Sequence, residues 1–255
     1  MTFLRLVAAL AASLAFSCSA AQIRVMISGG FSAAYDGLVQ QFQRETGHTI
    51  STVRGPSMGA TPQAIPNRID RGEPVDVLIM VREALDTLAE RGRVMPESRV
   101  DLARSSIAMA VKAGAPKPDI STMDAFRKTL LGAKSIAYSD SASGVYISTV
   151  LYQRLGLADA LKGKSRMIPA EPVGKVVARG EAEIGFQQLS ELKHVGSSID
   201  IVGLIPPEAQ KVTLFSAGIA TASTQPEAAK QLIDFLSSRK VHSAIANTGL
   251  EPVEQ

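Results

Sequence analysis

The chain has 255 residues, with 27 Lys and Arg against 24 Asp and Glu, for a formal net charge of +3. The basic residues are dispersed rather than gathered in a stripe, which argues against a nucleic-acid-binding protein. After the first residues no segment offers the roughly twenty apolar residues that a membrane span requires.

The first segment has the pattern of a secretory signal peptide. Arg5 precedes a short apolar run, residues 6–16, and small residues follow it. Cleavage is expected after Ala20 or Ala21, so we expect export to the periplasm. A lipoprotein site at Cys18 is the alternative, although the residues before Cys18 fit it poorly. Removal of this only cysteine would exclude disulfides, cysteine nucleophiles and thiolate metal sites from the mature chain.

Hydrophobic periodicity predicts alternating strands and helices in the first part of the mature chain. Strands are expected over residues 23–27, 49–53 and 75–81, and helices over 31–45, from Pro62 onward and over 83–91. This order predicts a parallel sheet whose binding loops follow the carboxyl ends of its strands.

A second unit with the same pattern follows. Strands are expected over 107–111, 135–138 and 182–186, and helices over 123–131, 144–155 and 173–178. A strand over 212–219 is expected to return to the first lobe, and helices over 226–236 and 241–247 close the chain. We therefore predict an α/β protein of two lobes, with 1–21 as the signal peptide, 22–104 and 215–255 as a discontinuous first lobe, and 105–214 as the second. Two crossovers between lobes would form a hinged cleft for a small ligand.

The most informative motif is the serine-rich segment, residues 138–146, where a strand end runs into a helix. The first turn of a helix has unpaired N–H groups and a partial positive charge, and the serines add hydroxyl donors. This pattern predicts an anion-binding site that needs no Lys or Arg. An ordinary helix cap is the alternative.

With these elements in place, the whole mature chain resembles the type II periplasmic solute-binding proteins, in the branch of the molybdate-binding proteins. The likeness rests on residues 25–32, 71–79, 139–146 and 180–186. It implies a two-lobe fold with the ligand cleft between the lobes, joined by two hinge crossovers.

The resemblance implies the fold of the molybdate-binding proteins but not their ligand. Where the molybdate-binding proteins have a characteristic serine and tyrosine, this chain has Gly30 and Gln188, so a different preference is expected. A glycine at position 30 would leave room for a larger, planar ligand such as an organic carboxylate. Residues 28–31, 55–68 and 185–191 are further similar to those of the periplasmic aconitate isomerases, which interconvert trans- and cis-aconitate.

This likeness implies an allylic proton shift on a small di- or tricarboxylate. We expect hydroxyl groups, backbone N–H groups and amides to bind the carboxylates. The predicted binding residues are Ser28, Gly29, Gly30, Ser57, Met58, Gly59, Arg68, Ser141, Ser143, Gly144, Val173, Gln187 and Gln188.

Three side chains are candidates for the acid or base. Tyr146 and Asp140 flank the serines, and Glu171 begins the next helix. Each also has a structural interpretation: Asp140 as a turn residue and Glu171 as an acid favoured by the helix dipole beside Pro172.

No phosphate-binding loop, His-Glu-x-x-His motif or acidic cluster with metal-ligand spacing occurs, so neither a metal nor a cofactor is expected. The alternative function is the receptor subunit of an ABC importer that delivers a carboxylate, or an oxyanion such as molybdate, to a permease.

Overall fold

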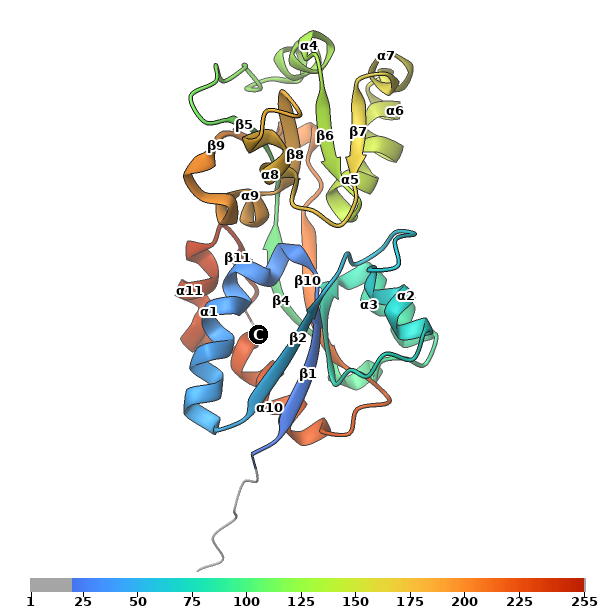
Figure 1. Ribbon diagram of the computed structural model, residues 1–255, viewed down its shortest axis with the longest axis vertical. Coiled ribbons are helices and arrows are strands. Elements are labelled where there is room, and N and C mark those ends of the chain that lie inside the picture. Colours follow the sequence, from blue (N-terminus) through green and yellow to red (C-terminus); the bar gives the residue numbers. More distant parts are fainter. Residues whose placement is uncertain (1–19, 255) are drawn as a thin grey trace, which may run out of the picture.

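The computed structural model describes residues 20–254, so Cys18 and all but the last two residues of the predicted signal peptide lie outside the described residues. Two β-sheets follow one another along the long axis of the molecule, each covered by helices (Figure 1). The predicted α/β class with two lobes is confirmed. Within residues 20–254 no helix has the length and apolar character needed to cross a bilayer.

The first lobe is built on a six-stranded sheet in the order β11-β4-β10-β3-β1-β2. Its strands are β1 (Gln22–Ile27), β2 (Thr49–Arg54), β3 (Val77–Val81), β4 (Val100–Ser105), β10 (Thr213–Ile219) and β11 (Glu251–Pro252). The predicted parallel arrangement of the first three strands is confirmed. The other three join antiparallel, because β4 and β10 belong to the crossings between the lobes rather than to strand-helix-strand units.

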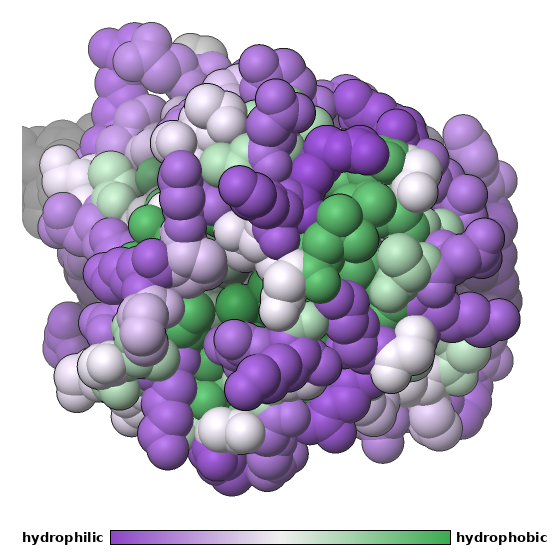
Figure 2. Space-filling view, turned by 90° about the horizontal axis from the view of Figure 1, so that it is seen from above, coloured by the Kyte–Doolittle hydropathy of each residue, from purple (hydrophilic) through white to green (hydrophobic). Residues whose placement is uncertain are grey.

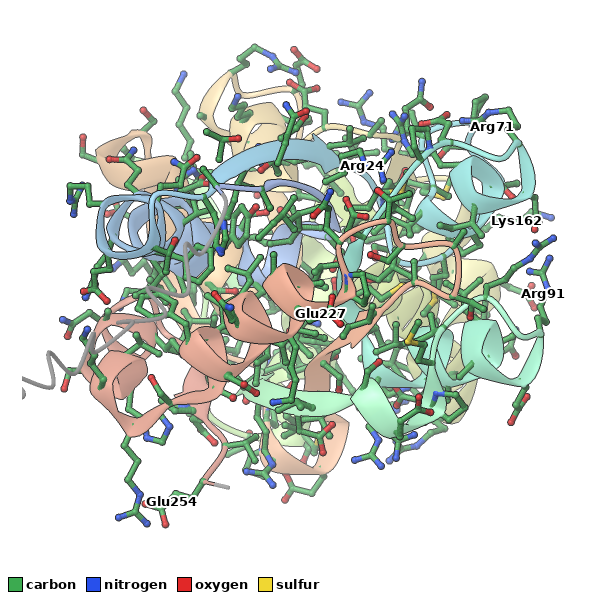
Figure 3. All side chains as sticks on the ribbon, turned by 90° about the horizontal axis from the view of Figure 1, so that it is seen from below. Arg24, Arg71, Arg91, Lys162, Glu227 and Glu254 are labelled. Atoms are coloured by element: carbon green, nitrogen blue, oxygen red, sulfur yellow. The ribbon has the colours of Figure 1, made fainter. Side chains whose placement is uncertain are left out.

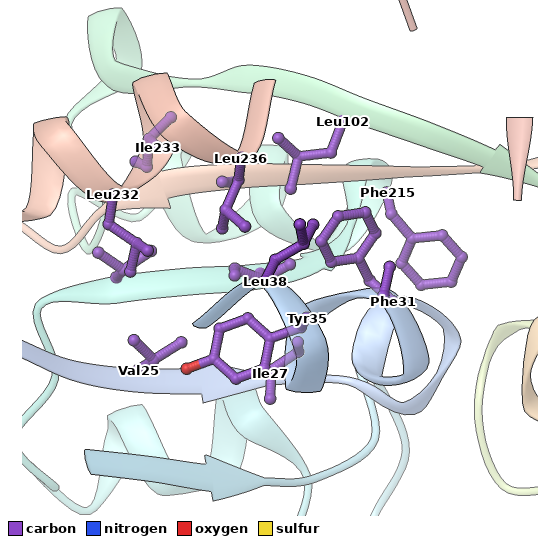
Figure 4. Close-up of a cluster of buried hydrophobic side chains, with 14 of the residues drawn as sticks. Val25, Ile27, Phe31, Tyr35, Leu38, Leu102, Phe215, Leu232, Ile233 and Leu236 are labelled. Carbon is purple, nitrogen blue, oxygen red and sulfur yellow. The ribbon is translucent and has the colours of Figure 1, made fainter. Parts of the chain in front are cut away.

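Helices cover both faces of this sheet. α1 (Gly29–Thr46), α10 (Pro226–Ser237) and α11 (His242–Asn247) lie on one face, and α2 (Ile65–Asp70) and α3 (Arg82–Glu90) on the other (Figure 1). Because side chains alternate along a strand, Val25 and Ile27 of β1 pack into the core beneath α1 and α10 (Figure 4). Met26 faces the core beneath α2 and α3. α2 begins three residues later than predicted, with Pro66 in its first turn.

The second lobe contains a five-stranded sheet in the order β7-β6-β8-β5-β9. Its strands are β5 (Ile107–Lys112), β6 (Ile136–Ser139), β7 (Ser165–Ile168), β8 (Ile184–Gln188) and β9 (Ile199–Leu204). Its helices are α4 (Met123–Gly132), α5 (Ala142–Tyr146), α6 (Tyr152–Arg154), α7 (Ala158–Lys162), α8 (Val173–Ala178) and α9 (Leu189–Val195). The single helix predicted from residue 144 begins at Ala142 and contains a π-helical turn, η2 (Ile147–Leu151).

The chain crosses between the sheets twice. β4 and β5 are separated only by Ser106, and the return runs from β9 to β10. The crossings thus lie at Ser106 and between Leu204 and Thr213, and the lobe boundaries predicted at 104–105 and 214–215, which fall inside β4 and β10, stay predictions. Short 3-10 turns lie at η1 (Pro96–Ser98), η3 (Gly196–Ser198), η4 (Pro207–Ala209) and η5 (Arg239–Val241).

Polar residues dominate the surface. At the end of the second lobe, polar side chains cover most of the surface and apolar ones emerge between them (Figure 2). Seen from the opposite end, charged side chains such as Arg71, Arg91 and Glu254 lie at the periphery (Figure 3). The dispersed charge expected from the sequence is therefore also dispersed in space.

Candidate functional site

A cleft of about 230 Å³ opens between the lobes. It is formed by loops at the carboxyl ends of β1, β2, β6, β7 and β8, which is where open α/β sheets place their ligands. The first lobe contributes Gly29, Arg54, Gly55, Pro56 and Gln63, and the second contributes Ser139, Asp140, Ser141, Ala170, Glu171, Pro172, Gln187 and Glu191.

A second cavity of about 560 Å³ adjoins this cleft. Gly29, Arg54, Pro172 and Glu191 line both spaces, so Glu191 stands where the two meet. The second cavity is also lined by the ionisable side chains of Asp36, Lys175, Arg179 and His194. It therefore extends the cleft into a space where acidic and basic groups are mixed.

Glu191 was not among the residues predicted from the sequence. It lies at the start of α9, one turn after β8 ends. Its Oε1 accepts a hydrogen bond of 2.9 Å from the Gln187 amide, whose own oxygen accepts one of 2.8 Å from Val173 N. The residue is half-buried, and Gln187 and Gly29 partly enclose its carboxyl end.

This enclosure changes the acidity of Glu191. Burial raises its pKa to about 7, the Gln187 hydrogen bond opposes the rise, and the charge of Asp140 adds to it. The carboxyl group can therefore both accept and donate a proton near neutral pH.

Asp140 is a second carboxyl in the cleft. It is buried, and burial raises its pKa, while a 2.9 Å hydrogen bond from Ala170 N to Oδ2 acts in the opposite direction. Ala170 has a φ of 53°, in the left-handed region that non-glycine residues rarely adopt. Such strain is held in place by its surroundings, here by the bond to Asp140, and it concentrates at functional loops.

The serine-rich segment is divided between cleft and core. Ser139 and Ser141 line the cleft, whereas Ser143 and Gly144 do not. The Ser143 hydroxyl lies 3.0 Å from that of Ser139 in the core. A side chain at Gly144 would overlap the Ser139 carbonyl, so this glycine permits the close approach of α5 to β6. Of the three residues predicted to bind an anion in this segment, Ser141 lines the cleft, whereas Ser143 and Gly144 do not; Ser139, which was not predicted, lines it as well.

The turn after β1 also differs from the prediction. Gly29 lines the cleft, but Ser28 and Gly30 do not. Ser28 is buried, and its hydroxyl has no hydrogen-bond partner. The space beside Gly30 is not open to a ligand, because the Phe215 ring fills it and packs near Phe31 (Figure 4).

The loop after β2 connects the lobes. Ser57 N donates to Ser141 Oγ at 3.3 Å, and Ser57 Oγ accepts from Val81 N at 3.0 Å. A Cβ at Gly59 would stand 3.0 Å from the Asp140 carbonyl oxygen. The Ser57–Ser141 hydrogen bond thus joins the lobes, Gly59 permits the close approach of its loop to Asp140, and Met58 lies beside a separate cavity.

Arg68 does not reach the cleft. Its guanidinium pairs with Glu73 at 2.7 Å and donates to the Gln63 carbonyl at 3.1 Å. The arginine that lines the cleft is Arg54, which pairs with Asp36. No local pattern distinguishes Arg54, because its place in the cleft depends on how the two lobes meet.

Two of the predicted acid or base residues, Tyr146 and Glu171, are held by other protein groups. The Tyr146 hydroxyl donates to the Ala209 carbonyl at 2.9 Å and accepts from Arg154 at 3.1 Å, within the second lobe. Glu171 lines the cleft, but Arg179 binds both of its oxygens, at 2.6 and 3.1 Å, and lowers its pKa. Neither arrangement suits a proton shuttle.

The two glutamines that end β8 have different positions relative to the cleft. Gln187 lines the cleft, whereas the Gln188 amide donates to Thr213 at 2.8 Å outside it. Ser190 donates to the Gly30 carbonyl at 2.6 Å, a second bond between the lobes. Val173 orients Gln187 through its N–H rather than lining the cleft. Within residues 20–254 no group of His, Cys, Asp and Glu is arranged to hold a metal ion.

Comparisons with known proteins agree with this architecture. The chain is 55% identical over 231 residues to an aconitate isomerase from Pseudomonas sp., covering 91% of this chain and 88% of that protein. It is 27% identical over 252 residues to the molybdate-binding protein ModA of Azotobacter vinelandii, covering 96% of each.

Solved structures support the same fold. The periplasmic molybdate-binding protein of Azotobacter vinelandii has a TM-score of 0.73 at 23% identity, over 91% of this chain and 100% of that one. The sulfate-binding protein SubI of Mycobacterium tuberculosis has a TM-score of 0.72 at 17% identity, over 91% and 87%. A sequence profile described as "Bacterial extracellular solute-binding protein" matches residues 23–251. The chain therefore belongs to the bacterial extracellular solute-binding protein family.

Proposed function

We propose that this protein is a periplasmic aconitate isomerase, which interconverts trans- and cis-aconitate in the cleft between its lobes. The observation that carries the proposal is the 55% identity to the Pseudomonas aconitate isomerase, which extends over 91% of this chain. The match covers 231 residues, so it extends over most of both lobes.

The reaction needs no redox chemistry. A base removes a proton from the methylene carbon, and the electron pair left by the C–H bond spreads over the allyl system and its carboxylates. A proton then returns to the other end of the allyl system, and the double bond has moved. The site must supply donors that strengthen their bonds as charge spreads, and a group that carries the proton.

The cleft contains groups suited to both tasks. Ser139, Ser141 and Arg54 offer donors for carboxylates, and Asp140 and Glu191 offer carboxyl groups with raised pKa values. Lys175 of the adjoining cavity would also attract a tricarboxylate, whereas the charge of Arg179 is offset by Glu171 and Glu181.

The alternative is a receptor that delivers a small anion to an ABC permease, as the resemblance to molybdate-binding proteins suggests. The 55% identity to an aconitate isomerase exceeds the 27% identity to that molybdate-binding protein, so the isomerase is the preferred function. Export through the segment 1–21 would place either protein in the periplasm.

Proton NMR of trans-aconitate mixed with the purified mature protein tests the proposal. We expect cis-aconitate signals to appear and both isomers to reach the same final ratio from either starting point. Binding of trans-aconitate without conversion would favour the receptor. Binding of molybdate in its place would overturn the choice of a carboxylate ligand.

A further inference from the structure

We propose that Glu191 is the residue that carries the proton during isomerisation, an assignment that rests on the proposed function. The Glu191 carboxylate would take the proton from the methylene carbon of trans-aconitate, and the C–H electron pair would enter the allyl system. The protonated carboxyl would then deliver a proton to the far allylic carbon. This second step restores the carboxylate, so each turnover ends with the enzyme unchanged.

The first argument is position. Glu191 is one of four residues that line both the cleft and the larger cavity, and it is the acidic one among them. It lies where β8 ends, across from the first turn of α1 in the other lobe. A ligand that spans the two spaces must pass its carboxyl group.

The second argument is orientation. Gln187 is fixed by Val173 N, so its NH₂ group points at Glu191 Oε1. On the opposite side Gly29 has no side chain, and a Cβ there would overlap the same oxygen. The carboxyl is thus held between a neutral amide and a bare backbone, which restricts its motion without a permanent positive charge.

The third argument is the comparison with the other cleft acids. Glu171 is bound by Arg179 through both oxygens, and a carboxylate held by a guanidinium is a weak base. Asp140 supports the strained Ala170 loop through its Oδ2. Glu191 is held by the Gln187 amide and the backbone of Gln188, so its basicity is preserved.

The surrounding charges determine when Glu191 can act. Asp140 and Glu171 face the cleft from the second lobe, Arg54 and Asp36 form a pair in the first lobe, and Lys175, Arg179 and His194 lie around the adjoining cavity. Asp140 raises the pKa of Glu191 through its charge, adding to the effect of burial. The base form is therefore the minor form in acid and the major form above neutral pH.

The test compares the mature protein with Glu191→Gln and with Glu90→Gln, an exposed glutamate at the end of α3. We expect Glu191→Gln to lower kcat by about 10²- to 10⁴-fold, the usual contribution of a general base. Glu90→Gln should match the parent protein. Calorimetry should show that Glu191→Gln still binds trans-aconitate within about 10-fold of the parent, which shows that the variant is folded and its cleft intact.

The outcomes separate the two proposals. If the parent converts trans-aconitate and Glu191→Gln does so at a similar rate, Glu191 is not the proton carrier and the isomerase remains. If the parent binds trans-aconitate without converting it, both proposals fail. Should Glu191→Gln not fold, Glu191→Asp withdraws the carboxyl by one methylene, and an unchanged kcat in that variant would also overturn the assignment.

Discussion

The first residue of α1, Gly29, lies directly against the carboxyl group of Glu191 from the opposite lobe, so closely that a Cβ at position 29 would overlap Oε1. The glycine is not required by its backbone, because its φ is not positive. A glycine is required because the Glu191 carboxyl of the other lobe occupies the space that a side chain would take. The contact thus joins the start of α1 in the first lobe to α9 in the second.

Gly29→Ala is expected to move the Glu191 carboxyl without harming the fold. The atom displaced is the free end of a flexible side chain, and alanine is a better helix residue than glycine. We expect kcat for trans-aconitate to fall at least 10-fold while the free energy of unfolding stays within about 1 kcal/mol of the parent. An unchanged kcat in Gly29→Ala would contradict the role given to this contact.

Gly30→Ala is the matched control for that variant. Its Cβ would overlap the ring of Phe215, which is packed in the core of the first lobe (Figure 4). Overpacking of this kind costs about 1–3 kcal/mol, so urea denaturation should show a clear loss of stability. Gly29→Ala should therefore lower kcat with little change in stability, whereas Gly30→Ala should lower stability.

Glu191 should make the stability of the protein depend on pH. Its pKa is about 7 in the folded protein against 4.5 ordinarily, so the folded state binds the proton more tightly than the unfolded chain. Its contribution to stability is full below about pH 4.5 and is lost as the pH rises through 7, by at most about 3 kcal/mol. Glu191→Gln lacks this titration, so it should gain stability over the parent between pH 5 and pH 8. If the free energy of unfolding changed with pH by the same amount in the parent and in Glu191→Gln, the raised pKa of Glu191 would be contradicted.

Ser141→Ala should mainly weaken ligand binding, whereas Ser143→Ala should mainly lower the stability of the fold. Ser141 lines the cleft, so its loss should weaken trans-aconitate binding by about 5- to 10-fold, equal to about 1 kcal/mol, and the lost hydrogen bond from Ser57 N should cost at most about 1 kcal/mol of stability. Ser143 bonds to Ser139 in the core, so its loss should cost about 1–2 kcal/mol of stability and leave binding unchanged. Calorimetry measures the binding and thermal denaturation measures the stability of both variants. Weaker binding in Ser143→Ala with unchanged binding in Ser141→Ala would contradict the prediction.

Much of the fold follows from local patterns in the sequence. The alternation of Val25, Met26 and Ile27 between two cores is the period-two pattern that predicts β1. Helix α8 occupies the predicted residues, 173–178. The short edge strand β7 was not predicted, because only one of its four residues is buried and it lacks an apolar signal.

The site was harder to predict than the fold. Four residues that the local sequence predicted for the site, Gly29, Asp140, Ser141 and Gln187, line the cleft. It could not show which side chains of each loop point inward, so Ser143 and Tyr146 were assigned to the site although they bond within the second lobe.

Glu191 was missed for a similar reason. It follows the strand end by one helical turn, in the position of an ordinary acid near a helix start. Only its approach to Gly29, across the two lobes, distinguishes it. A contact between residues 162 positions apart leaves no local signal that a single sequence can reveal.

The most direct test of the account is the pH dependence of kcat for trans-aconitate isomerisation, measured on the parent protein and on Glu191→Gln from pH 5 to pH 9. With the anionic ligand bound, the pKa of Glu191 should be at or above its value of about 7 in the free protein. We predict that kcat of the parent rises with pH through this region and that the slow variant shows no such rise. A parent profile that is flat across neutral pH, or a rise of the same size in Glu191→Gln, would contradict the account.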